Sequence, residues 1–379
     1  MQDSCSRMDA WILFQGSMFS FCRLPCTGLR MAACIFALQS QKRKGGHDDA
    51  IWSIGIDQNT GEPHGQPREM LRGLGWIGGF SASKVGKRLV FWRSDVSDQV
   101  FVSDFDGNSR KMSSPRRLTI DRSANFWAVD WTADSKAVVF ASTRDGTHTI
   151  YKQELDATTP DLLNKWRKVE VIFPRLSGDG SEILYADTDK PDDPKQPVDL
   201  MAVPIAGGTP RVILSEPGIN NFICAKPPLQ VCILNELLAA GNFFYLFDFR
   251  QGKGRLVAKL PGNANSGFSP DGSTLALDDG STVRFVSIDS GIVKDVVLKD
   301  WPVRKSADWS ADSKVLLIAS VTPAGAPVIL AIDLDGNVKV LLEGDRSAPL
   351  GYVVPSPDGK HGALDITTGE SNVWMVENF

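Results

Sequence analysis

The chain has 379 residues, of which 42% are hydrophobic and 23% are charged, with a formal net charge of −4 at neutral pH. This is an ordinary globular composition, and the mild acidity without a Lys/Arg stripe argues against nucleic acid as a partner. The longest uncharged run near the N-terminus, residues 10–22, is too short for a helix that crosses a membrane. We therefore expect a globular protein without a membrane span.

Residues 1–45 differ from the rest of the chain, because they hold four of the six cysteines and four of the eight methionines without any turn rhythm. Asp3 and Asp9 fall where a secretory signal would be basic, so the segment makes a poor signal peptide. We expect a disordered tail or a mis-called start here. A genuine targeting segment is the alternative.

The next stretch contains a glycine motif. GLGWIG at Gly73–Gly78 satisfies the G-x-G-x-x-G pattern, which binds nucleotides when a strand precedes it and a helix follows it. Here the following residues, 80–91, read as strand, turn and strand. We therefore expect a loop between repeats, and no cofactor.

From there to the C-terminus a short phrase recurs: an aromatic or apolar residue, Ser or Thr, any residue, Asp, Gly or Ser, and then an apolar run. The clean copies are WTADSKAVVF (131–140), LSGDGSEILY (176–185), FSPDGSTLAL (268–277), WSADSKVLLI (309–318) and PSPDGKHGAL (355–364). Their aspartates are 45, 92, 41 and 46 residues apart, and 92 is two steps of 46. A drifted copy at 222–236 fills that gap, and a looser copy lies at 80–91, which gives seven units.

A period of 40–50 residues indicates a propeller or a solenoid, and the content of each unit decides between them. Residues 126–155 read as strand, tight turn, strand, turn and strand, without sustained helical periodicity. The sequence therefore predicts an all-β fold, a β-propeller of four-stranded antiparallel blades. We expect seven blades, with six or eight as alternatives. Residues 50–379 would form one propeller whose last blade is closed by an N-terminal strand.

The repeated aspartates are predicted to be structural turn residues at the first hairpin of each blade, because Asp bonds the backbone ahead of it in such turns. They are Asp134, Asp179, Asp271, Asp312 and Asp358. The D-x-D-G run at Asp333–Gly336 lacks the flanking helices of a calcium loop, so we expect a hairpin turn. No metal site is expected.

Cys224 and Cys232 flank the tight Pro-Pro segment of the drifted copy, at the ends of two predicted antiparallel strands. Across such a hairpin two cysteines can fall within disulfide reach. A disulfide and two buried free thiols are both open at this point.

Candidate ligand-binding residues lie on the first strand of a blade, which lines the central channel of propellers. Close to the apolar anchor these strands carry Asp130, Arg175 and Asp308. Charges on an innermost strand are costly unless they are solvated or paired, so we expect them to contact either a ligand or one another and water. The chain has no G-x-S-x-G elbow and only four histidines, none at metal-binding spacing. We therefore expect no catalytic residues and no enzyme.

The phrase S-P-D-G-[KS] followed by an apolar run resembles the WD40-like PD40 repeat of TolB-type propellers. The ending from Ser356 to Phe379 and the stretch from Cys224 to Gly254 are similar to the propellers of acidobacterial sensor proteins. In those proteins the propeller follows a Ser/Thr kinase or winged-helix domain and a membrane helix.

The resemblance, which covers residues 50–379, implies a bacterial, periplasmic or otherwise extracytoplasmic binding module for a protein, peptide or small ligand. We expect a monomer. A cytoplasmic location stays open because the chain shows no clear signal peptide. Two alternative functions also stay open: a propeller-based hydrolase, lyase or peptidase-associated propeller, and a fragment of a receptor kinase.

Overall fold

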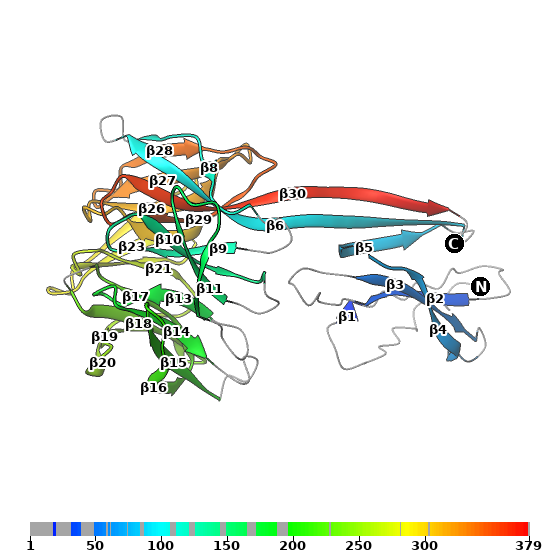
Figure 1. Ribbon diagram of the computed structural model, residues 1–379, viewed down its shortest axis with the longest axis horizontal. Helices are drawn as coiled ribbons and strands as arrows, with labels where there is room; N and C mark the ends of the chain where they lie inside the picture. The colour runs from blue at the N-terminus through cyan, green and yellow to red at the C-terminus, as the bar shows by residue number, and fades with distance from the viewer. Residues whose placement is uncertain are drawn as a thin grey trace. The chain divides into compact units, whose positions relative to one another are not determined.

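The elements that the structure describes are β-strands throughout (Figure 1). This computed structural model describes residues 18–19, 32–38, 49–57, 60, 62–73, 75–83, 87–106, 111–120, 126–144, 149–164, 172–187, 196–226, 229–280, 282–301 and 304–377. The chain divides into two compact units. Unit 1 comprises residues 1–96 and 369–379, and unit 2 comprises residues 97–368.

Five sheets of unit 2 each consist of four strands that follow one another along the chain and pair antiparallel. Blade 1 contains β9 (Phe126–Trp131), β10 (Ala137–Ser142), β11 (Thr149–Glu154) and β12 (Asp161–Asn164). Blade 2 contains β13 (Ile172–Leu176), β14 (Glu182–Asp187), β15 (Pro197–Pro204) and β16 (Arg211–Pro217). Blade 3 contains β17 (Ile219–Cys224), β18 (Val231–Leu238), β19 (Gly241–Asp248) and β20 (Gly252–Leu260). Blade 4 contains β21 (Asn265–Phe268), β22 (Thr274–Asp278), β23 (Thr282–Ser287) and β24 (Val293–Val297). Blade 5 contains β25 (Arg304–Trp309), β26 (Val315–Val321), β27 (Pro327–Asp333) and β28 (Val338–Glu343).

Blade 6 combines strands from both ends of the propeller sequence. Its first two strands are β29 (Leu350–Pro355) and the first part of β30 (His361–Glu377). The third is the second part of β6 (Arg88–Asp106), which also pairs with the short strands β7 (Lys111–Met112) and β8 (Arg116–Arg117). The predicted closure of the last blade by an N-terminal strand is therefore confirmed, and β6 is that strand.

The six first strands form a closed ring, because β9, β13, β17, β21, β25 and β29 contact one another in that order and β29 contacts β9. The seven-blade prediction is not confirmed, since the described residues of unit 2 form six sheets. The drifted copy at 222–236 is a blade, as expected, with β17 and β18 on either side of its turn. The looser copy at 80–91 lies in unit 1 and accounts for the extra unit in the count.

Unit 1 contains the sheet of β1 (Met18–Phe19), β2 (Ala32–Leu38), β3 (Ala50–Ile56) and β4 (Pro63–Leu71). It also contains β5 (Trp76–Ala82), which pairs with the first part of β6. Ile51, Ile77, Leu89 and Phe91 form its buried core. The structure therefore assigns residues 50–96 to unit 1, whereas the sequence prediction placed them in one propeller with the rest.

Two earlier expectations fall in unit 1. Residues 32–38 of the atypical N-terminal segment form β2, which pairs along its whole length with β3; most of the remaining residues of 1–45 lie outside the described part. The glycine motif at 73–78 overlaps the start of β5, so a strand lies where a nucleotide site requires a helix.

The core of unit 2 consists of six apolar clusters, each shared by two adjacent blades. Between blades 1 and 2, for example, Val139 of β10 packs with Ile183 of β14. The next residue of β14, Leu184, faces the other way and packs with Phe222 of blade 3. Because successive side chains of a strand point to opposite faces, the second strand of a blade is buried on both sides. This explains the continuous apolar runs in the repeated phrase.

The five repeated aspartates hold the first turn of their blades, and each turn has the same hydrogen bonds. A Ser or Thr hydroxyl two residues earlier donates to Oδ1 at 2.6–2.7 Å, and the backbone N–H two residues later donates to it at 3.0–3.2 Å. These donors hold the pKa of every one of these carboxyls below 3.8, although burial works in the opposite direction.

The residue after each of these aspartates has a positive φ of 58–71°, which favours glycine. Blades 2, 4 and 6 have Gly there, whereas blades 1 and 5 have Ser135 and Ser313. Each serine hydroxyl accepts a backbone N–H from the neighbouring blade, from Asp358 at 3.0 Å and from Asp271 at 3.2 Å. The left-handed serine conformation is thus offset by a hydrogen bond between blades.

Two other expectations concern turns. Cys224 and Cys232 face each other in the register of β17 and β18 and are joined by a disulfide. Asp333 accepts the backbone N–H groups of Asp335 and Asn337 at 2.9 Å, which makes residues 333–337 a hairpin turn between β27 and β28.

The turn geometry predicts a pH-dependent stability. Since the pKa of Asp271 lies below 3.8 in the folded chain, its contribution to the free energy of unfolding is present above that pH. The contribution is lost as the pH falls through the lowered value. We expect Asp271→Asn to be less stable than the wild type at neutral pH, by a difference that shrinks below pH 3.8.

Urea unfolding of both proteins across this pH range measures the effect. The exposed Asp300, changed to Asn, is the matched control and should show no such trend. A stability difference for Asp271→Asn that stays constant into acid would contradict the assignment.

Candidate functional site

The three charged residues predicted for the innermost strands lie at equivalent places, one residue before the apolar end of the first strand. Asp130 precedes Trp131 in β9, Arg175 precedes Leu176 in β13, and Asp308 precedes Trp309 in β25. The two tryptophans anchor the ends of β9 and β25. Their indole N–H groups donate to the first strand of the preceding blade, to Val354 O at 2.8 Å and to Gly267 O at 3.1 Å.

Asp130 is paired with a lysine that the sequence did not single out. Lys226, in the turn after β17, places its Nζ 2.6 Å from Oδ1 of Asp130, which is only 6% exposed at its side chain. The same oxygen accepts the N–H of Trp131 at 2.8 Å. The backbone N–H of Lys226 donates to Pro270 O of blade 4 at 3.0 Å, which fixes the lysine in place. The ion pair thus joins blade 1 to blade 3.

Arg175 and Asp308 are less completely paired. Nη1 of Arg175 donates to Val129 O at 2.7 Å, and Oδ1 of Asp308 accepts the N–H of Trp309 at 2.8 Å. Both side chains are partly exposed. Within the described part of the chain, neither forms an ion pair closer than 4 Å.

The four charges act on one another. Desolvation by the surrounding protein raises the pKa of Asp308, while the positive charges of Lys226 and Arg175 oppose this and the negative charge of Asp130 adds to it. We call Asp130, Arg175, Lys226 and Asp308 the charge cluster. The structure therefore brings the three predicted residues together, and their role toward a ligand stays a prediction.

The sequence also did not reveal Asp365, a carboxyl that interacts with Arg175 of the charge cluster. Asp365 of β30 is 4% exposed, and its Oδ1 accepts the N–H of Ala128 in β9 at 2.7 Å. Its Oδ2 is buried and has no hydrogen-bond partner in the described part of the structure. Burial raises the pKa of Asp365 well above its usual range, with a further contribution from Asp98 and an opposing one from Arg175. Burial raises the pKa of the Tyr352 hydroxyl in β29. The positive charge of Arg175 opposes this shift, and the negative charge of Asp365 adds to it.

Metal-binding groups and membrane-spanning helices are both absent from the described part of the chain. Its His, Cys, Asp and Glu side chains form no group of three that could hold a metal ion. That same part contains no helix with the length and apolar character of a membrane span.

No protein-family model matches the chain, and no curated protein matches its sequence. Among solved structures, the chain is similar to a protein assigned as TolB from Agrobacterium tumefaciens, with 18% identity and a TM-score of 0.56 over 72% of this chain and 100% of that one. It is also similar to TolB from Acinetobacter baumannii, with 14% identity and a TM-score of 0.50 over 90% of this chain and 82% of that one.

These similarities show a fold, which is that of a TolB-like β-propeller. The finer resemblance to kinase-linked sensor proteins is not shown by them. An oligogalacturonate lyase from Vibrio parahaemolyticus also matches, with 15% identity and a TM-score of 0.46 over 70% of this chain and 77% of that one. At that TM-score the match supports no inference about chemistry.

The Asp130–Lys226 pair gives a direct test of the cluster. Lys226→Met would leave the buried Asp130 carboxylate unpaired, so we expect the free energy of unfolding to fall by about 3 kcal/mol. Adding Asp130→Asn to that variant removes the unpaired charge and should restore most of the loss. Chemical denaturation of the two single variants and the double variant completes the cycle.

Lys314 is the matched control, because its ion pair with Asp312 is exposed, at 76% and 57% of the two side chains. Lys314→Met should cost less than about 1 kcal/mol. An equal loss in the free energy of unfolding for both lysine variants would contradict the idea that burial makes the Asp130–Lys226 pair more important for stability than an exposed pair.

Proposed function

We propose that the propeller of unit 2 is a non-catalytic binding module that recognises a peptide, a protein segment or a small polar ligand at the charge cluster. In this proposal it serves as the sensor part of an envelope signalling protein. The proposal rests on the unequal pairing within the cluster, which separates residues that support the site from residues that contact the ligand.

The observation that carries the proposal is the unused hydrogen-bonding capacity of Arg175 and Asp308. A guanidinium has five N–H donors, and Arg175 uses one of them on Val129 O. The carboxylate of Asp308 accepts one backbone N–H. Opposite charges that are partly exposed and incompletely paired suit a ligand that offers an acceptor to Arg175 and a donor or cation to Asp308.

Asp130 and Lys226 have the supporting role in this proposal. Their 2.6 Å ion pair is anchored on both sides by backbone hydrogen bonds, to Trp131 and to Pro270. Side chains that are fixed in this way lose little further entropy when a ligand binds, which favours affinity. The pair would therefore form a rigid wall beside Arg175 and Asp308.

The Cys224–Cys232 disulfide supports an extracytoplasmic location for this module. Disulfides form and persist in oxidising compartments such as the periplasm, and they are rare in the cytosol. The resemblance to PD40 propellers of envelope proteins points in the same direction.

A hydrolase or lyase is the second candidate, and the raised pKa of Asp308 is the observation that favours it. A raised pKa moves a carboxyl toward the range in which it can act as a general acid. Such catalysis also needs a second acid or base within hydrogen-bond reach. Among the described residues, the hydrogen bonds of Asp308 include none to another carboxylate or to a histidine, which is why we favour binding.

The test is a pull-down from a bacterial envelope extract with the full chain, compared with an Arg175→Gln/Asp308→Asn double variant. We expect the wild type to retain a partner that the double variant does not. The proposal also predicts a rise in Tm for the wild type with the retained ligand, since a ligand that binds only the folded state stabilises it.

Asp300→Asn, an exposed change outside the cluster, should behave as the wild type in both assays. Capture of the same proteins by the wild type and the folded double variant would contradict the proposal. Turnover of the retained ligand that depends on Asp308 would favour the enzyme instead.

A further inference from the structure

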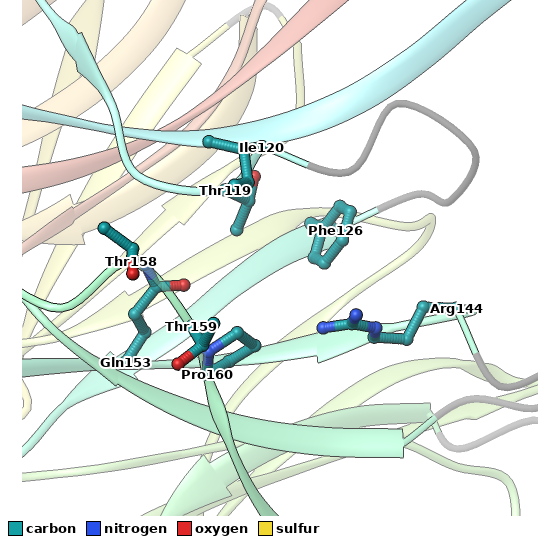
Figure 2. Close-up of a pocket in the computed structure, with 8 residues that line it drawn as sticks. All are labelled: Thr119, Ile120, Phe126, Arg144, Gln153, Thr158, Thr159 and Pro160. Atoms are coloured by element: carbon teal, nitrogen blue, oxygen red, sulfur yellow. The ribbon is translucent and has the colours of Figure 1, made fainter.

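A small cavity in unit 2 has features of a second binding site. It has a volume of about 200 Å³ and is bounded by blade 1 and by the segment that leads into it (Figure 2). A water molecule occupies about 30 Å³ of liquid, so the cavity has room for several water-sized groups. None of the residues in the charge cluster lines it.

Gln153 of β11 presents a hydrogen-bond acceptor to this cavity. The residue is 2% exposed, and its Nε2 donates to Leu118 O at 3.0 Å and to Ala157 O at 2.9 Å. Since both N–H donors are used by carbonyls, the orientation of the amide is fixed and Oε1 must be on the other side. Figure 2 shows the amide group of Gln153 at the wall of the cavity.

The Oε1 atom of Gln153 accepts no hydrogen bond from the residues that the structure describes. An acceptor at the cavity wall that has no donor from the protein is available to an occupant of the cavity that donates a hydrogen bond. A hydroxyl or N–H group of a ligand meets that requirement.

Arg144 brings a positive charge to the same cavity. Its guanidinium extends toward the space opposite Gln153 (Figure 2), and its Cζ lies 5.6 Å from the centre of the Tyr151 ring. Among the described residues no carboxylate forms an ion pair with it. An arginine that rests on an aromatic ring and has free donors is well suited to bind a carboxylate through two parallel hydrogen bonds.

The rest of the lining is largely apolar. Phe126, Ile120 and Pro160 contribute carbon surface, and Thr158 and Thr159 also line the cavity (Figure 2). Specific small-molecule sites combine apolar walls with a few fixed polar groups in this way. The walls would take the carbon body of a ligand whose polar ends face Arg144 and Gln153.

We propose that this cavity binds a small organic carboxylate with an apolar body and one hydroxyl or N–H donor, such as a 2-hydroxy acid. The carboxylate would pair with Arg144, and the donor would satisfy Oε1 of Gln153. This site is separate from the charge cluster, so the proposal goes beyond the binding function inferred for that cluster.

The experiment titrates the full chain with mandelate, a 2-hydroxy acid with a phenyl body, and follows binding by calorimetry and ligand-observed NMR. Arg144→Gln should weaken the binding of mandelate by about tenfold or more, as expected for a lost charge-assisted hydrogen bond. Phenylacetate, which lacks the hydroxyl, should bind the wild type about fivefold more weakly than mandelate, and benzyl alcohol, which lacks the carboxylate, should bind as weakly as mandelate binds Arg144→Gln.

Arg346→Gln is the matched control, because Arg346 is exposed and outside the cavity, and it should leave the affinity for mandelate unchanged. The Arg175→Gln/Asp308→Asn variant should also bind mandelate normally, which separates this proposal from the function of the charge cluster. Absence of saturable binding at millimolar mandelate, or equal affinity in the wild type and Arg144→Gln, would overturn it. Loss of mandelate binding in the Arg175→Gln/Asp308→Asn variant alone would place the ligand at the charge cluster and would also overturn it.

Discussion

The propeller depends on one constraint, which is that the second strand of every blade must bury both of its faces against neighbouring blades. Val139, Ile183 and Leu184 illustrate this, because adjacent residues of one strand enter different apolar clusters. A single blade cannot satisfy that requirement, so each needs two neighbours and the series has to close into a ring. The six shared clusters of unit 2 are the direct result.

The same constraint determines where polar chemistry can lie. Most side chains that pack between blades are apolar, so a buried charge there needs a specific partner, as Glu236 of β18 has in Lys253 of β20. Asp130 and Asp365 are each likewise stabilised by a specific partner, Lys226 in one case and the Ala128 N–H in the other. The cavity beside Gln153 is a place where a cluster margin leaves apolar surface and polar atoms together.

The repeated phrase predicted most of the fold because it combines a tight turn with a doubly buried strand, and both are local properties. The blade count failed at residues 80–91, where strand, turn and strand read as a repeat although β5 and β6 belong there to unit 1. The sequence also located Asp130, Arg175 and Asp308. The sequence did not predict Lys226 because its copy of the phrase has drifted. It did not predict Asp365 because the apolar residues around it are typical of a buried core. Arg144 and Gln153 meet only through the tertiary fold, which no spacing reveals.

Blade 6 is built from the two ends of the propeller sequence, since β6 pairs beside β30 while β29 completes the sheet. During synthesis its inner strands emerge only after the other five blades have left the ribosome. Until then β6 of the nascent chain would lack its partner β30. Pairings between residues so far apart in sequence form slowly, and unpaired edges invite association with other chains. The last blade is therefore the part of the propeller whose assembly depends most on a contact between distant segments of the chain.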